Sequence, residues 1–116
     1  MREPMKIQKL VRDNIPQIIE SQGRNCSFRV LSDNEYENAL NAKLQEELDE
    51  FLQSKNVEEL ADLQEVIFAI LSQKNISLQQ FEALRKEKLE KNGGFSKKNI
   101  LVRERLIFFN ILAILG

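Results

Sequence analysis

Apolar residues recur at helical spacing along most of this chain and predict about four helices. The first is expected from about Asn14 to Gln22, with Pro16 in its first turn, where proline is tolerated. The second follows a capping box formed by Ser32 and Glu35 and continues to about residue 54. An i, i+4 row on this helix is expected to face the core, and it comprises Tyr36, Leu40, Leu44, Leu48 and Leu52.

Two further helices are expected in the second half of the chain. The third follows Asn56, and its residues 60–71 are apolar on more than one face, which is typical of a central, buried helix and leaves room for a partner chain on its far side. The fourth begins at a second capping box, Ser77 with Gln80, runs to about Lys91 and stops at Asn92-Gly93-Gly94.

This pattern predicts an all-α protein, a small helical bundle in which the second and third helices form an antiparallel pair. At 116 residues the chain fits one domain, 1–116. Residues 26–31 alternate only weakly, so one short strand or hairpin near the N-terminus and an extended connector fit equally well. The apolar tail, 101–116, is too short to span a bilayer and is expected to pack against this or a neighbouring subunit.

Two acidic strings on the predicted helix pair are the strongest chemical signal in the chain. Glu47 and Glu50 on one helix, and Glu59 and Asp62 on the next, are each three residues apart, so each pair lies within about 60° on one helix face. Glu47 borders the apolar row, whereas Glu46 points nearly opposite it. If the two helices pair as predicted, the acids converge, and a bound cation would offset the cost of bringing them together.

Composition narrows the chemistry further. The formal net charge of -1 gives no general attraction for nucleic acid. The chain has no histidine, and its single cysteine, Cys26, excludes a disulfide framework, so carboxylates remain as metal ligands and general bases. Oxygen ligands favour Mg²⁺, with Mn²⁺ as the other candidate. Without a signal peptide or a bilayer-spanning run, the sequence is expected to be soluble and cytoplasmic.

Simpler explanations compete with each of these signals. Acidic pairs are common on solvated helix faces, and Glu59, at the third position after Asn56, would also fit a capping box. A basic cluster at the end of the fourth helix could meet phosphate or merely favour the helix dipole. Its members are Arg85, Lys86, Lys88, Lys91, Lys97 and Lys98.

Taken together, these motifs resemble the all-α nucleoside triphosphate pyrophosphohydrolases of the MazG type. The pattern is EExxE at residues 46–50 followed by ExxD at residues 59–62. The string KLVRDNIP at residues 9–16 and the segment 88–95, which contains Gly93-Gly94-Phe95, are similar to the ends of a subgroup described as phosphoribosyl-ATP pyrophosphohydrolase-like. The resemblance covers about residues 6–100.

The resemblance implies a helical homodimer or dimer of dimers that hydrolyses a nucleoside triphosphate to the monophosphate and pyrophosphate with Mg²⁺. The implied metal ligands are the acids Glu47, Glu50, Glu59 and Asp62. Glu46 is implied as a supporting acid near the attacking water. Candidate phosphate contacts are Arg12, Arg85 and Lys88.

The chain departs from the family pattern at two positions, Asn14 and Asn92, where members often carry Lys and Arg. Phe28, Tyr36 and Phe95 are candidates for contact with the base. The expected function is removal of a nucleotide from the cellular pool by cleavage of its α–β phosphoanhydride. Two alternatives stay open: hydrolysis of phosphoribosyl-ATP in histidine biosynthesis, and a non-catalytic helical module for oligomerisation or regulation.

Overall fold

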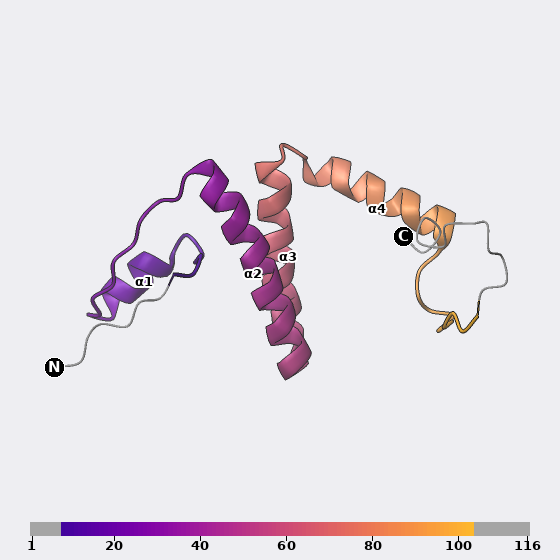
Figure 1. Cartoon of the computed structure of the whole chain (residues 1–116), viewed down its shortest axis with the longest axis horizontal. Helices are drawn as coiled ribbons and strands as arrows, with labels where there is room; N and C mark the ends of the chain where they lie inside the picture. Colours follow the sequence, from indigo (N-terminus) through magenta and orange to yellow (C-terminus); the bar gives the residue numbers. More distant parts are fainter. Residues whose placement is uncertain (1–7, 104–116) are drawn as a thin grey trace. The chain divides into compact units, whose positions relative to one another are not determined.

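The computed structural model describes residues 8–103, which form four α-helices and no β-strand (Figure 1). The helices are α1 (Ile15–Ser21), α2 (Asp33–Ser54), α3 (Val57–Gln73) and α4 (Leu78–Asn92). The predicted all-α class is therefore confirmed for this part of the chain. The described residues divide into two compact units, one ending at Glu82 and the next beginning at Ala83.

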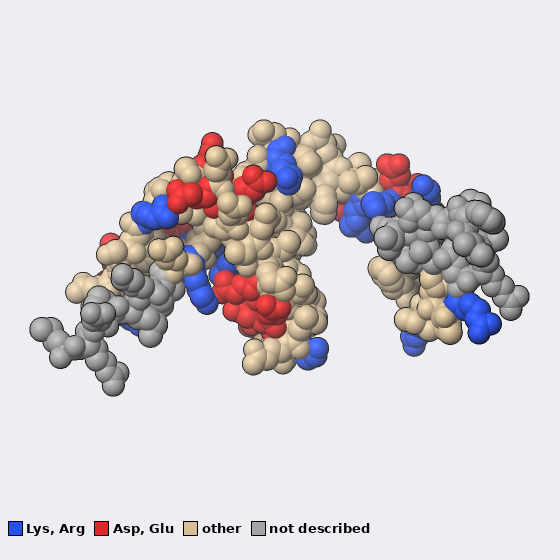
Figure 2. Space-filling view, in the orientation of Figure 1, with Lys and Arg blue, Asp and Glu red and all other residues tan. Residues whose placement is uncertain are grey.

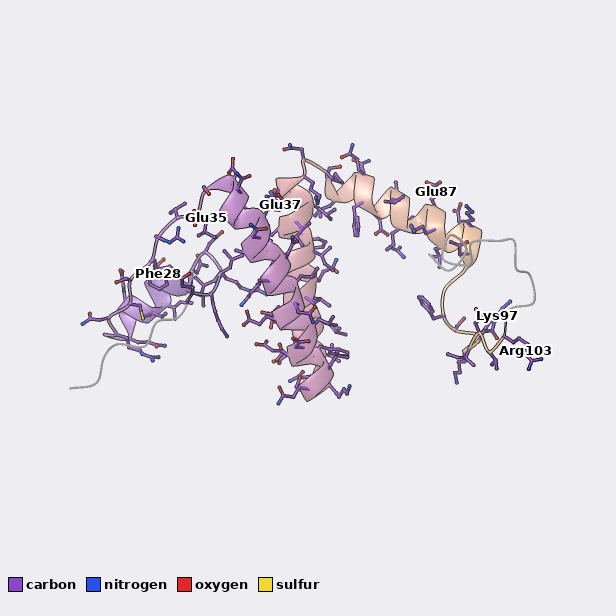
Figure 3. The ribbon with its side chains drawn as sticks, in the orientation of Figure 1. Phe28, Glu35, Glu37, Glu87, Lys97 and Arg103 are labelled. Atoms are coloured by element: carbon purple, nitrogen blue, oxygen red, sulfur yellow. The ribbon has the colours of Figure 1, made fainter. Side chains whose placement is uncertain are left out.

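Local capping chemistry determines where α2 begins. Ser32 Oγ accepts a hydrogen bond from the Glu35 N–H at 3.3 Å, and Glu35 Oε1 accepts one from the Ser32 N–H at 3.2 Å. Arg29 donates to Glu35 Oε2 at 2.8 Å, and this bond, together with the cap, lowers the pKa of Glu35 to about 2. Figure 3 shows Glu35 near the start of α2 and Phe28 in the connector that precedes it.

The connector between α1 and α2 is extended but unpaired. Residues 24–32 contain no helix, and no strand in residues 8–103 lies beside them to form a ladder. Of the two assignments that the sequence allows for residues 26–31, the extended connector is therefore correct and the short strand is wrong.

The turn between α2 and α3 is short because both helix ends are satisfied locally. Lys55 ends α2 in the left-handed conformation (φ 60°), and its N–H donates to the Phe51 carbonyl at 2.8 Å. Asn56 caps α3, and its Oδ1 accepts from the Glu58 N–H at 3.0 Å. The two helices consequently run antiparallel and side by side (Figure 1), as the sequence predicts.

The core of the first unit lies between these two helices and is thin. Leu40 from α2 and Val66 and Leu71 from α3 are its buried apolar residues among those described. The prediction that the apolar row of α2 faces the core as far as its end is wrong, because Leu48 is 37% exposed and Leu52 is 52% exposed. Helix α3 covers only those side chains of α2 that point into the space between the two helices. These side chains form a narrower stripe than the whole apolar face of α2.

Helix α4 also begins and ends at local signals. Ser77 Oγ accepts from the Gln80 N–H at 3.1 Å, and Gln80 Oε1 accepts from the Ser77 N–H at 2.8 Å, which confirms the second capping box. Gly93, with φ 81°, follows the last helical residue. Figure 3 places Lys97 and Arg103 in the segment beyond α4. Each helix within residues 8–103 is too short or too polar to cross a membrane.

Two predictions fall wholly or partly outside the described residues. The structure describes only residues 101–103 of the predicted apolar tail, so its packing against this or another subunit stays a prediction. The prediction of a single domain over 1–116 includes residues outside 8–103 and likewise stays a prediction. The described residues belong to two units.

Candidate metal centre

The hairpin of α2 and α3 brings the acids of both strings together. One carboxylate oxygen each of Glu47, Glu59 and Asp62 lies within 4.8 Å of the other two, and Glu46, Glu47 and Glu50 form a second group with the same spacing. Glu47 belongs to both groups. Figure 2 shows acidic side chains gathered on this hairpin with basic side chains beside them. We call these five residues the acidic cluster.

Glu46 reaches the cluster although its position on α2 points nearly opposite the apolar row. Its side chain is long, and two ammonium groups hold its carboxylate. Lys9 Nζ lies 3.3 Å from Glu46 Oε1, and Lys43 Nζ lies 3.4 Å from Glu46 Oε2. Helical periodicity predicts the direction in which the Glu46 side chain leaves the helix, whereas the two ion pairs determine the position of its carboxylate.

Glu47 is the buried member of the cluster, with 6% of its surface exposed. Its Oε1 is 3.3 Å from Lys43 Nζ, whereas Oε2 is buried and has no hydrogen-bond partner among residues 8–103. Burial raises the pKa of Glu47 above its usual range; Lys43 opposes this shift, and the nearby Glu50 carboxylate adds to it. A buried carboxylate oxygen without a partner is unfavourable unless a cation or a proton satisfies it.

Glu59 does not serve as a capping residue. The Asn56 N–H, which a capping box would direct to Glu59, donates instead to Ser54 Oγ at 3.1 Å. The capping-box explanation for Glu59 is therefore wrong, and its carboxylate lies with Glu47 and Asp62 instead.

Within residues 8–103, three basic side chains form ion pairs with the cluster, and only one of them was predicted at this site. Arg12 was expected to contact phosphate, and its Nη2 donates to Asp62 Oδ1 at 2.7 Å. Lys9 and Lys43, which pair with the α2 acids, were missed. For Lys43 a signal was present, because it precedes Glu46 and Glu47 by three and four residues, the spacing of helical ion pairs. No comparable local spacing joins Lys9 to Glu46.

A cavity of about 530 Å³ adjoins the cluster within the first unit. It lies between the N-terminal residues 10–18 and the helices α2 and α3, and Glu47 and Asp62 contribute to its lining. Arg12 and Asn14 line it as well, as does Tyr36, one of the aromatic residues that we expected near a base. The cavity is large enough for part of a small molecule, and both charged and aliphatic side chains line it.

The remaining predicted contacts belong to the second unit. Arg85 and Lys88 lie on α4, and Asn92 is its last residue. Phe95 lies beyond α4 and is 98% exposed within this unit. Their predicted roles in binding phosphate or base stay predictions.

The donor set of the cluster fits a hard divalent cation. All its ligand atoms are carboxylate oxygens, and one of them, Glu47 Oε2, is buried with no partner from the residues that the structure describes. Mg²⁺ and Mn²⁺ prefer such oxygens over nitrogen or sulfur. The residues that would hold the ion are Glu47, Glu50, Glu59 and Asp62.

Comparison with known proteins adds one partial match. The chain is 55% identical over 42 residues to an uncharacterized protein of Mycolicibacterium smegmatis, and the match covers 36% of this chain and 43% of that protein. The matched part thus spans less than half the length of this relative. No family model and no solved structure matches the chain.

Proposed function

We propose that this protein is a Mg²⁺-dependent nucleoside triphosphate pyrophosphohydrolase. The observation that carries the proposal is the buried Glu47 carboxylate, whose Oε2 lacks a partner within the described part of the chain and lies beside the carboxylates of Glu59 and Asp62. Lys43 pairs with one oxygen of this buried carboxylate and leaves the other without a hydrogen bond, as expected of a protein that binds a cation in its working state.

The reaction would add water across the α–β phosphoanhydride and yield a nucleoside monophosphate and pyrophosphate. A divalent ion bound by Glu47, Glu50, Glu59 and Asp62 would supply positive charge to the triphosphate as it reacts. Cleavage at this bond differs from phosphatase chemistry because it releases pyrophosphate, whereas a phosphatase releases inorganic phosphate.

The protein's own residues would position the nucleotide. Arg12 uses Nη2 for Asp62, and a guanidinium has five N–H donors, so others can contact a phosphate while the ion pair persists. The adjoining cavity offers aliphatic surface and Tyr36 to the nucleoside. Glu46 would orient the attacking water, and Lys9 and Lys43 restrain its carboxylate for that purpose.

A pyrophosphate assay tests the proposal. Purified protein is incubated with a panel of NTPs, dNTPs and phosphoribosyl-ATP in Mg²⁺, and released pyrophosphate is measured. We expect turnover of at least one NTP or dNTP and a large loss in Glu50→Gln. Glu37→Gln is the matched control, because Glu37 is an exposed acid of α2 away from the cluster (Figure 3).

The outcomes separate the alternatives. Turnover of phosphoribosyl-ATP in preference to every NTP and dNTP would identify the biosynthetic substrate while retaining the same chemistry. Absence of pyrophosphate from all substrates, or equal activity of Glu50→Gln and wild type, would contradict the proposed activity.

A non-catalytic oligomerisation module is the second candidate, favoured by the apolar side chains that the first unit leaves exposed. Leu52, Val57 and Leu60 are 52%, 74% and 42% exposed around the turn between α2 and α3. This candidate predicts self-association without any effect of Mg²⁺ on thermal unfolding. The enzyme proposal predicts stabilisation of ~2.7 kcal/mol at ~100 times the dissociation constant of the ion.

A further inference from the structure

Lys43 is a half-buried cation inside the acidic cluster, and the proposed reaction gives it no direct part. Its side chain is 19% exposed and lines the cavity beside Glu47 and Asp62. A lysine next to a divalent cation site is costly, since two positive charges in one site repel each other. Its presence therefore calls for a physical explanation.

The contacts of Lys43 are specific to single oxygens. Its Nζ lies 3.4 Å from Glu46 Oε2 and 3.3 Å from Glu47 Oε1. Lys43 thus bridges the carboxylates of Glu46 and Glu47. Because all three residues lie on α2, one helix determines the geometry of this bridge. Glu46 Oε1 is held separately by Lys9 at 3.3 Å.

The bridge leaves the two carboxylates in different states. Both oxygens of Glu46 are paired with ammonium groups. Glu47 has one paired oxygen, and its buried Oε2 has no partner in residues 8–103. Lys43 thus restrains the Glu47 side chain through one oxygen while the other stays available to an ion.

We propose that Lys43 is a positioning residue that holds Glu46 and Glu47 in the orientation required for divalent cation binding. The inference rests on the proposed metal site and deepens it. Lys43 does not contact substrate in this account; it acts through the two carboxylates, as hydrogen-bonded partners of metal ligands commonly do.

A purely electrostatic role predicts the opposite effect. If Lys43 only supplied compensating charge in the metal-free protein, its removal would relieve repulsion and strengthen cation binding. If Lys43 positions the carboxylates, its removal frees two rotamer-rich side chains and weakens binding. The sign of the change in affinity therefore distinguishes the two roles.

The test is a Mn²⁺ titration of the full chain, followed by the electron paramagnetic resonance signal of free Mn²⁺. Wild type is compared with Lys43→Met, Lys43→Arg and the control Lys74→Met, which removes an exposed lysine at the C-terminus of α3. We expect Lys43→Met to weaken Mn²⁺ binding by about 10- to 100-fold. Lys43→Arg, which retains donors and charge, should recover most of the affinity, and Lys74→Met should match wild type.

Circular dichroism in EDTA establishes that each variant is folded. If Lys43→Met does not fold, Lys43→Gln replaces it, since glutamine is too short to bridge both carboxylates and the same loss is expected. Equal or tighter Mn²⁺ binding by the folded variant, or an arginine variant as weak as the methionine variant, would overturn the positioning role. Absence of Mn²⁺ binding by wild type would instead overturn the metal site itself, and the role of Lys43 with it.

Discussion

At the scale of single residues, Glu47 is central because it is buried, has an oxygen without a partner among residues 8–103 and lies beside four acidic neighbours. A buried ionised group with too few partners destabilises the fold. We therefore expect the Glu47 carboxylate to lower the stability of the metal-free protein and to add to it once a cation is bound.

Replacing Glu47 should separate its effect on the stability of the metal-free protein from its effect on cation binding. We expect Glu47→Gln to unfold at the same or a higher temperature than wild type in EDTA, because the amide carries no buried charge. The variant should lose the Mg²⁺-dependent stabilisation of ~2.7 kcal/mol that wild type gains at ~100 times the dissociation constant. Differential scanning calorimetry with and without Mg²⁺ measures both effects, and equal stabilisation of the two proteins would contradict the assignment of Glu47.

The raised pKa of Glu47 makes the same penalty depend on pH. A carboxyl whose pKa is higher in the folded than in the unfolded protein contributes most to stability below its usual value of 4.5, and this contribution disappears as the pH rises through the raised pKa. In EDTA, the advantage of Glu47→Gln over wild type should therefore shrink as the pH falls from 7 towards 4.5. Urea unfolding at a series of pH values measures the difference, and a difference independent of pH would count against the burial of an ionised Glu47.

The sequence could predict that Glu47 meets other acids but not what holds them. Helical spacing and a short turn, both of which are local, bring Glu47 together with Glu50 in one group and with Glu59 and Asp62 in another. Lys9 contacts Glu46 across 37 residues of sequence, and such a pair depends on how the N-terminal segment lies against α2. No periodicity within either segment encodes that contact.

At the scale of helices, local side-chain chemistry determines the boundaries. The predicted starts of the four helices, and the predicted ends of α1, α2 and α4, agree with the structure to within about two residues, which is the usual scatter of helix termini. Ser32, Asn56 and Ser77 each accept from a backbone N–H of the helix that they precede. Capping residues act within one turn, so sequence alone reveals them.

The α2 cap offers a direct test of this local control. Ser32→Ala removes the oxygen that accepts from the Glu35 N–H and should lower the free energy of unfolding by ~1 kcal/mol. Ser72→Ala on α3 is the control, because Ser72 is exposed and should change stability by less than ~0.5 kcal/mol. Urea denaturation measures both variants, and equal effects would show that the cap does not stabilise α2.

At the scale of the whole molecule, the small core of the first unit is the feature that periodicity could not predict. Apolar spacing on α2 indicates which side chains prefer burial, but it does not reveal what covers them. The structure covers Leu40 and leaves Leu48 and Leu52 largely exposed. The part of the fold that depends on local signals was predictable, whereas burial depends on neighbours distant in sequence or in another chain.

This exposed apolar surface leads us to expect self-association of the full chain as a homodimer or a dimer of dimers. Leu52→Glu and Leu60→Glu place charge where apolar contacts would form and should shift the protein towards smaller species. Sedimentation velocity measures the distribution. Glu37→Gln, on an exposed part of α2, should behave as wild type, and a monomeric wild-type protein would contradict the expected assembly.

The location of the ion is the most direct test of the whole account. Crystals soaked in Mn²⁺ should give an anomalous difference peak at the manganese edge among the carboxylates of Glu47, Glu59 and Asp62. The same soak of Glu47→Gln crystals should give none. Wild-type crystals in which these side chains are ordered but no anomalous peak lies between them would contradict the proposal that the acidic cluster binds a catalytic cation.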